Sequence, residues 1–252
     1  SSIVMEWEPF MSLRMPLHSL LIRLTLMLGT LLSSGCATVQ QEPAPTLSLD
    51  ASSGHARFIG PISWDSVHRF QALVKGKSVR VLEVDSRGGS TEAAIALGYW
   101  IHQQQLTLEV SRLCLGSCAN YWFPAARKKL IQPGAIVAWQ GNLHYQLLQH
   151  EQPELFEQKA VTLSGDDVRL LRQQVSLEQL FYKQIGVDER VCWIGKLPPY
   201  KADGYFVLPP EDLRRFAIRE VRTEIDYSAR SVEHWQTQFP LQKVVLPFGG
   251  AL

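Results

Sequence analysis

The stretch that decides the fold is Val79-Arg-Val-Leu-Glu-Val-Asp-Ser-Arg-Gly-Gly89, where an apolar run ends at a polar, glycine-rich turn. The run is rich in β-branched residues, which is typical of a strand buried on both faces of a sheet. A helix is expected directly afterwards, because Ala94, Leu97 and Ile101 recur at helical spacing. Residues 106–110 then predict another strand. This order of elements predicts parallel strands joined by right-handed crossovers.

The same alternation extends in both directions along the chain. Upstream, residues 56–60 predict a strand, and Ser63 is placed to cap a helix. The apolar face of that helix consists of Val67, Phe70 and Val74. Downstream, the predicted elements are a helix over 119–126, strands over 129–132 and 135–139, a long helix from 166 to a cap at Gly186, a strand over 205–208, a short helix at Pro210 and a strand over 217–221.

One folded α/β domain with appendages is predicted, because 252 residues with 46% hydrophobic content suffice for a single sizeable core. We expect this domain over residues 55–225. Residues 37–54 are polar and contain prolines, so they are predicted to form a flexible tether. The tail over 226–252 is apolar enough to pack on the domain or on a neighbouring copy. Residues 141–165 show no clear period.

Residues 1–36 have the features of an export signal. Arg14 and Arg23 supply positive charge before a short apolar stretch, 24–32, whereas a membrane-spanning helix needs about 20 apolar residues. The stretch is followed by Ser-Ser-Gly-Cys36, which resembles a bacterial lipoprotein signal, in which the cysteine becomes the acylated first residue of the mature chain. An ordinary secretory signal with an incidental cysteine is the alternative. We therefore expect a lipid-anchored protein on the periplasmic face of a bacterial envelope.

Charge and cysteine content argue against several kinds of partner. The chain has 25 basic and 24 acidic residues and a net charge of +1, without the basic run that a phosphate backbone attracts. Nucleic acid is therefore not an expected partner. The four cysteines form no paired CxxC units and have no histidine nearby at zinc-finger spacing. Neither a metal nor another cofactor is expected.

Two predicted loops combine glycine with a hydroxyl group. They are 85–89, which contains Gly88 and Gly89, and 113–118, in which Ser117 opens a helix. Both follow the carboxyl ends of strands, where an open α/β sheet binds its ligands. Glycines let backbone N–H groups approach a ligand, and a serine at a helix start lies beside free N–H donors, so the loops together can form an oxyanion hole. Taken singly, a glycine pair is usually a turn and such a serine an N-cap.

These loops carry a resemblance to a known superfamily. Over roughly 56–222 the chain resembles the Clp protease/crotonase superfamily, and most of all a periplasmic, serine-hydrolase-like branch of it. The segments that carry the resemblance are Ile59-Gly-Pro-Ile62, Val84-Asp-Ser-Arg-Gly-Gly89, Gly116-Ser-Cys118 and Tyr205–Ile218. The resemblance implies a stack of ββα units with a mainly parallel sheet and Ser117 as nucleophile. It also implies that the N–H groups of Gly88 and Cys118 face the oxyanion, with Gly89 beside the substrate.

The general base is where the chain departs from this superfamily. The superfamily has a histidine at the end of the strand after a Pro-Gly turn, but here Gln140 occupies that position. An amide has no basic lone pair at neutral pH, so Gln140 is assigned only to substrate binding. His144 lies four residues further on, and a bend in the loop would bring it to Ser117. We therefore take His144 as the candidate base, with His150 as a weaker choice.

Two further details stay open at the level of the sequence. The acid that orients the histidine is expected near Asp188 or Glu189, and spacing does not select between them. Cys114 and Cys118 flank the serine, and we expect buried free thiols because a helix start holds the Cβ atoms poorly for a disulfide. Cys118 as an alternative nucleophile is a minor hypothesis, since a helix N-terminus acidifies a thiol.

Two functions are consistent with these residues, so whether the chain is an enzyme stays open. The first is an envelope serine hydrolase, peptidase-like, which acts on a peptide or small acyl substrate through an acyl-enzyme at Ser117. The second is a catalytically inactive pseudoenzyme of the same fold that binds peptide or acyl ligands, a reading that Gln140 favours. Crotonase chemistry is not expected, because no acyl-CoA signature is present. The resemblance also implies a homo-oligomer.

Overall fold

The computed structural model describes residues 44–159 and 161–247. The expected signal over 1–36, with Cys36, lies outside the described residues. In this described part, no helix is both long enough and apolar enough to cross a bilayer. The elements follow in the order β1 (Thr46–Asp50), β2 (His55–Ile59), α1 (Trp64–Val74), β3 (Val81–Ser86), α2 (Thr91–Gln103), β4 (Thr107–Leu115), the π-helix η1 (Cys118–Trp122), α3 (Phe123–Ala125), β5 (Lys128–Ile131), β6 (Ile136–Ala138), α4 (Leu143–Glu151), η2 (Pro153–Phe156), α5 (Gly165–Ile185), η3 (Glu189–Cys192), η4 (Ile194–Lys196), β7 (Tyr205–Val207), α6 (Pro210–Leu213), η5 (Arg214–Phe216), β8 (Val221–Arg222), α7 (Tyr227–Trp235) and β9 (Leu241–Lys243).

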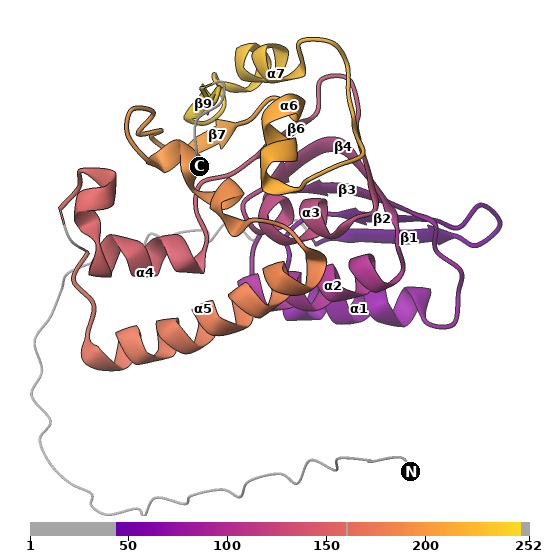
Figure 1. Ribbon diagram of the computed structural model, residues 1–252. Helices are drawn as coiled ribbons and strands as arrows, with labels where there is room; N and C mark the ends of the chain where they lie inside the picture. The colour runs from indigo at the N-terminus through magenta and orange to yellow at the C-terminus, as the bar shows by residue number, and fades with distance from the viewer. Residues whose placement is uncertain (1–43, 160, 248–252) are drawn as a thin grey trace, which may run out of the picture. The chain divides into compact units, whose positions relative to one another are not determined.

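A mainly parallel sheet forms the centre of the domain (Figure 1). Its strands lie in the order β1-β2-β3-β4-β5-β8, and β6 also pairs with β4. The β1–β2 pair is antiparallel, whereas β2, β3, β4, β5, β6 and β8 pair in parallel. A separate small sheet joins β7 and β9. The predicted α/β fold with a mainly parallel sheet is confirmed.

The sheet is covered by helices, which is why its central strands are apolar. Leu82 and Val84 of β3 are fully buried, and Figure 1 shows α1 and α2 along one face of the sheet. Phe58 of β2 packs edge-on against Phe70 of α1, with ring centroids 5.7 Å apart. The predicted cap of α1 is confirmed, because the Ser63 hydroxyl accepts from a backbone N–H in the first turn.

The pairing of β3 with β4 positions the two loops singled out in the sequence. These strands are parallel neighbours, and Ser86 near the end of β3 is in register with Cys114 near the end of β4. Carboxyl ends of neighbouring parallel strands meet at one edge of a sheet. The loop with Gly88 and Gly89 and the loop with Ser117 therefore lie side by side.

The expected tether is partly wrong, because residues 46–50 form a strand. In β1 they pair antiparallel with β2. Leu47 and Leu49 alternate with polar residues and pack against the core, so one face of this strand is apolar. The folded domain therefore begins before His55.

The predicted helix over 119–126 is present, but its first part is a π-helix. Pro124 has no N–H, so it cannot donate to the carbonyl of Asn120 as an α-helix would require. That carbonyl instead accepts from the Tyr182 hydroxyl at 2.8 Å. The carbonyl of Ala119 accepts from the indole of Trp139 at 3.1 Å. Side chains from distant elements thus donate to the carbonyls that the π-helical turn leaves free. The spacing of apolar residues in this segment does not predict such donors.

Two elements differ from the predicted boundaries. Residues 141–165, which show no regular spacing of apolar residues, contain the short helix α4. This helix is capped by Asn142, whose side chain accepts from the N–H of Tyr145. The strand predicted over 217–221 is reduced to β8, because Ala217 adopts a left-handed conformation with φ of 63°. That conformation ends η5 and delays the strand.

The tail packs on its own domain. The hydroxyl of Tyr227 in α7 donates to the carbonyl of Val137 at 3.3 Å and accepts from its N–H at 2.7 Å. The Trp235 indole donates to the carbonyl of Gly134 at 2.9 Å. Residues 241–243 complete the β7–β9 pair. The tail therefore supports β6, the strand that leads to Gln140.

Candidate functional site

Ser117 lies at the junction between β4 and the π-helix η1. Gly116 has a φ of 53° and makes the sharp turn that ends the strand. The Ser117 side chain is mostly buried, with 7% of the residue exposed. Its hydroxyl donates a hydrogen bond to the carbonyl of Gly89 at 3.2 Å. The structure thus brings together the serine and the glycine pair that the sequence singled out.

Close packing explains why both positions of the glycine pair hold glycine. Gly88 has a φ of 93°, and a Cβ there would lie 2.8 Å from the carbonyl oxygen of Leu115 and 2.9 Å from the nitrogen of Ser117. Gly89 has a φ of 148°, and a Cβ there would overlap the carbonyl of Ile62. A larger residue at position 88 would therefore push the two loops apart, and one at position 89 would displace the segment before α1.

The two predicted oxyanion donors have different environments. The N–H of Gly88 donates to the hydroxyl of the buried Ser86 at 3.1 Å, so this donor is used within its own loop. The N–H of Cys118 lies in the first turn of η1, where N–H groups have no acceptor inside the helix. The backbone N–H of Cys118 is therefore better placed than that of Gly88 to donate a hydrogen bond to an oxyanion at this site.

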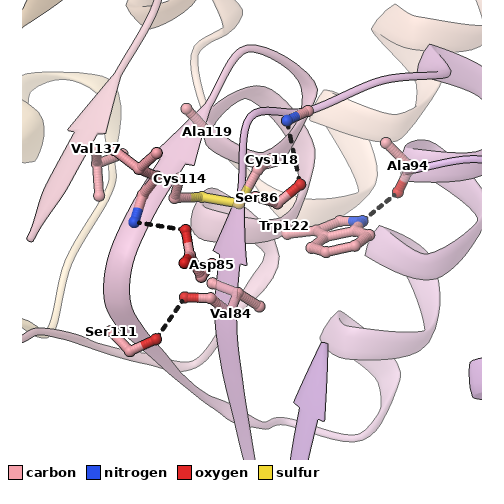
Figure 2. The surroundings of a disulfide bond; sticks show 12 residues. Val84, Asp85, Ser86, Ala94, Ser111, Cys114, Cys118, Ala119, Trp122 and Val137 are labelled. Atoms are coloured by element: carbon pink, nitrogen blue, oxygen red, sulfur yellow. Dashed lines mark hydrogen bonds between the residues drawn. A yellow bond between two sulfur atoms is a disulfide. The ribbon is translucent and has the colours of Figure 1, made fainter. Parts of the chain in front are cut away.

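The expected free thiols are wrong, because Cys114 and Cys118 form a disulfide (Figure 2). Their Cα atoms are 5.1 Å apart, which lies in the range that a disulfide requires. The bond joins the end of β4 to the start of η1, on both sides of Ser117. Since Cys118 is bonded and fully buried, it is no free nucleophile. Cys192 is a buried free cysteine.

Ser117 opens onto a small polar pocket of about 180 Å³. Its polar lining includes the carboxamides of Asn120, Gln140, Asn142 and Gln146 and the hydroxyls of Ser117 and Thr91. Among the described lining residues, the ionisable side chains are Arg87 and Tyr121. Burial, with the nearby Glu178 carboxylate, raises the pKa of Tyr121 well above its ordinary value. The described lining therefore supplies hydrogen-bond donors and acceptors but no base at neutral pH.

One acceptor of this lining is unsatisfied. Asn120 is 4% exposed, and its Nδ2 donates to the carbonyl of Gly141 at 2.9 Å. Its Oδ1 is buried and has no hydrogen-bond partner among the described residues. A buried acceptor without a donor is costly, but this oxygen has almost no accessible surface, so a ligand in the pocket does not reach it in this conformation.

His144 lies in the first turn of α4, beside the pocket rather than in its described lining. Its Nδ1 is 2.9 Å from Oε1 of Glu189, and this hydrogen bond raises the pKa of His144 against the opposing effect of burial. Asp188 pairs instead with Arg190. Of the two acids considered in the sequence, Glu189 is thus the one that contacts His144. Its assignment as base stays a prediction.

The other histidine considered as a base lies at the far end of α4. His150 Nδ1 is 2.8 Å from the carbonyl of Val161. Val161 lies in the loop between α4 and α5, so His150 contacts this loop through its Nδ1.

The sequence analysis missed Glu178, a fully buried carboxylate on α5. It accepts from the Tyr121 hydroxyl at 2.5 Å and from the N–H of His144 at 2.9 Å. Burial raises the pKa of Glu178 to about 7. A signal was present, because Glu178 continues the helical spacing of the buried Leu171 and Val175.

An apolar hollow of about 340 Å³ adjoins the polar pocket. Thr91 and Leu143 line both spaces. The hollow also includes Ile95, Tyr99 and Leu177 from α2 and α5. A ligand in the Ser117 pocket can therefore extend an apolar group into the neighbouring space.

The fold and site define an α/β protein with a serine-bearing polar pocket at the carboxyl edge of a parallel sheet. No model of a protein family matches this chain, and a search of curated proteins finds no match either. Among solved structures, it is similar to 1510-N, a membrane-bound stomatin-specific protease in mutant form, with 10% sequence identity and a TM-score of 0.39. The similarity covers 76% of this chain and 95% of that one.

Proposed function

We propose that this chain binds peptide or acyl ligands in the Ser117 pocket and does not turn them over through an acyl-enzyme. The pocket offers hydroxyl and carboxamide groups, which suit the carbonyl and N–H groups of such ligands. The neighbouring apolar hollow suits an apolar side chain or acyl chain.

The observation that carries this proposal is the hydrogen bonding of Ser117. Its hydroxyl proton is directed to the Gly89 carbonyl, and the described lining contains no group that takes a proton at neutral pH. A serine hydroxyl without an adjacent base is a very weak nucleophile. With its proton on Gly89, the hydroxyl oxygen can still accept a hydrogen bond from a ligand N–H.

The remaining hydrogen-bonding groups of the lining support the same function. The Ser117 hydroxyl oxygen would accept from a ligand N–H, while the carboxamide of Gln140 or Gln146 would donate to a ligand carbonyl. A peptide unit supplies both groups, so it can form both hydrogen bonds at once.

Two measurements on the purified protein test the proposal. A titration with N-acetyl-trialanine amide, followed by NMR, is expected to shift the amide signals of Ser117, Asn120 and Gly141. A fluorophosphonate probe is expected to leave the wild type unlabelled. Labelling that disappears in Ser117→Ala would overturn the proposal in favour of hydrolysis.

A gain-of-function variant sharpens this test. Gln140 lines the pocket with Ser117, so Gln140→His introduces an imidazole on the same wall. We expect fluorophosphonate labelling of Gln140→His and none of the matched control Gln140→Asn. A failure of Gln140→His to label would show that more than the base is missing.

A serine hydrolase with His144 as base is the second candidate. It is favoured by the Glu189 contact at Nδ1 of His144, because an acid on one ring nitrogen orients the other for proton transfer. For this mechanism the start of α4 would have to carry His144 to Ser117. Labelling of the wild type that is lost in both Ser117→Ala and His144→Ala would support it.

We also propose export and lipid attachment at Cys36. The signal-like segment supports this, and so does the Cys114–Cys118 disulfide, since disulfides persist in oxidising compartments. Mass spectrometry of the membrane fraction would detect an acylated Cys36. Retention of Cys36→Ala in that fraction would count against the anchor.

A further inference from the structure

Glu178 connects two elements that are far apart in the sequence. Its Oε1 accepts from the Tyr121 hydroxyl at 2.5 Å and from the N–H of Leu143 at 3.4 Å. Its Oε2 accepts from the N–H of His144 at 2.9 Å. One fully buried carboxylate thus holds a side chain of η1 and the first turn of α4.

Both of these elements line the Ser117 pocket. The π-helix η1 begins directly after Ser117 and supplies Asn120 and Tyr121 to the lining. The segment at the start of α4 supplies Asn142 and Leu143. Glu178 itself lies behind this lining, so it acts on a ligand only through the groups that it holds.

We propose that Glu178 is a positioning residue whose ionised carboxylate clamps these two walls together, so that ligand affinity falls when the carboxylate is protonated. For the ligand, this inference rests on the function proposed above. The clamp itself is a property of the protein without ligand.

The hydrogen bonds to Glu178 give the direction of the effect, because those from Leu143 and His144 lower its pKa. A state in which α4 moves away while Glu178 stays buried therefore binds the proton more tightly and is favoured at low pH. An ionised carboxylate only accepts, and its hydrogen bonds are about twice as strong as neutral ones. Protonation turns one oxygen into a donor, which weakens its hold on Tyr121 and on Leu143. It also removes the negative charge that the N-terminus of α4 favours.

The charge environment places this protonation near neutral pH. Burial raises the pKa of Glu178 to about 7, with the Glu189 carboxylate contributing in the same direction. Besides Glu189, the titratable groups around it are Tyr121 from η1, His144 from α4, Tyr182 from α5 and Cys192 from η3. Of these, His144 has a pKa raised by its hydrogen bond to Glu189, so the experiment must separate its titration from that of Glu178.

The test combines a measurement without ligand and one with ligand. Hydrogen exchange by NMR gives protection factors for the amides of Leu143 and His144 at pH 8 and pH 6. We expect both to fall about fivefold or more at pH 6 in the wild type. In Glu178→Gln they should be low and independent of pH. The dissociation constant of N-acetyl-trialanine amide should rise by a similar factor from pH 8 to pH 6.

Two further variants serve as controls. His144→Asn keeps the backbone N–H that Glu178 binds, so its pH dependence should match the wild type. Tyr121→Phe removes one donor and should lower protection at pH 8 if Glu178→Gln proves too unstable to study.

The outcomes separate the clamp from the proposed function. Protection factors that do not change with pH overturn the clamp, whether or not the peptide binds. A pH dependence that disappears in His144→Asn also overturns it. Protection that changes as expected, without peptide binding at either pH, supports the clamp and counts against the proposed function.

Discussion

Replacement of Glu178 by glutamine should reduce the pH dependence of folding stability. The carboxylate is fully buried, and desolvation raises its pKa from 4.5 to about 7. The folded state therefore binds this proton more tightly than the unfolded state does. Stability from this group is fully present below pH 4.5 and is lost as the pH rises through 7.

The magnitude follows from the size of this pKa shift. A change of one in pKa corresponds to about 1.4 kcal/mol, so raising the pH from 5 to 8 costs the wild type about 2 to 3 kcal/mol through this residue. Glu178→Gln has nearly the same shape but cannot ionise. Its free energy of unfolding should therefore lack this loss. The Glu178 charge also helps to raise the pKa of His144, so the same comparison in a His144→Asn background removes the contribution of His144.

Urea denaturation at pH 5 and pH 8 measures this difference. Glu233→Gln is a suitable control, since Glu233 is exposed on α7 and should follow the wild type. A loss of stability in Glu178→Gln within about 0.5 kcal/mol of the wild-type loss would refute the reasoning. We expect Glu178→Gln to bind the peptide more weakly than the wild type at pH 8. Because the variant should be relatively more stable at that pH, unfolding would not explain the weaker binding.

Three further substitutions test the packing around the pocket. Gly88→Ala should lower the melting temperature by several degrees and abolish peptide binding, because its Cβ meets backbone 2.8 Å away. The control Gly76→Ala also has a positive φ, of 70°, but open space around it, so it should cost only the backbone strain of about 1 to 2 kcal/mol and leave peptide binding unchanged. Removing the buried disulfide with Cys118→Ala should cost roughly 2 kcal/mol or more in thermal unfolding, and an unchanged melting temperature would contradict its structural role. Tyr227→Phe leaves the N–H of Val137 without its partner, so urea denaturation should show a loss of about 1 to 3 kcal/mol.

Local patterns predicted most of the secondary structure correctly. The apolar run in β3 and the spacing of Leu97 and Ile101 in α2 are short-range signals that hold in the fold. The two glycine-bearing loops were also paired correctly, because neighbouring parallel strands end at the same edge.

The sequence predictions are wrong where a local structure depends on hydrogen bonds from distant parts of the chain. The thiols are expected to stay free, but the turn at Gly116, with a φ of 53°, lies between the two cysteines, and they form a disulfide. The π-helix η1 is stable because Tyr182 and Trp139 supply donors to its carbonyls. A period within one segment carries no information about such partners.

The chain sequence was sufficient for the α/β class, the parallel strand order near the centre and the position of Ser117 after a strand, because periodicity and glycine placement act over a few residues. The partners of the polar groups depended on tertiary contacts. His144 pairs with Glu189 across a separation of 45 residues, and Tyr121 pairs with Glu178 across 57. Burial and hydrogen bonding between such distant residues set protonation and geometry, so the chemistry of the pocket is a property of the folded chain.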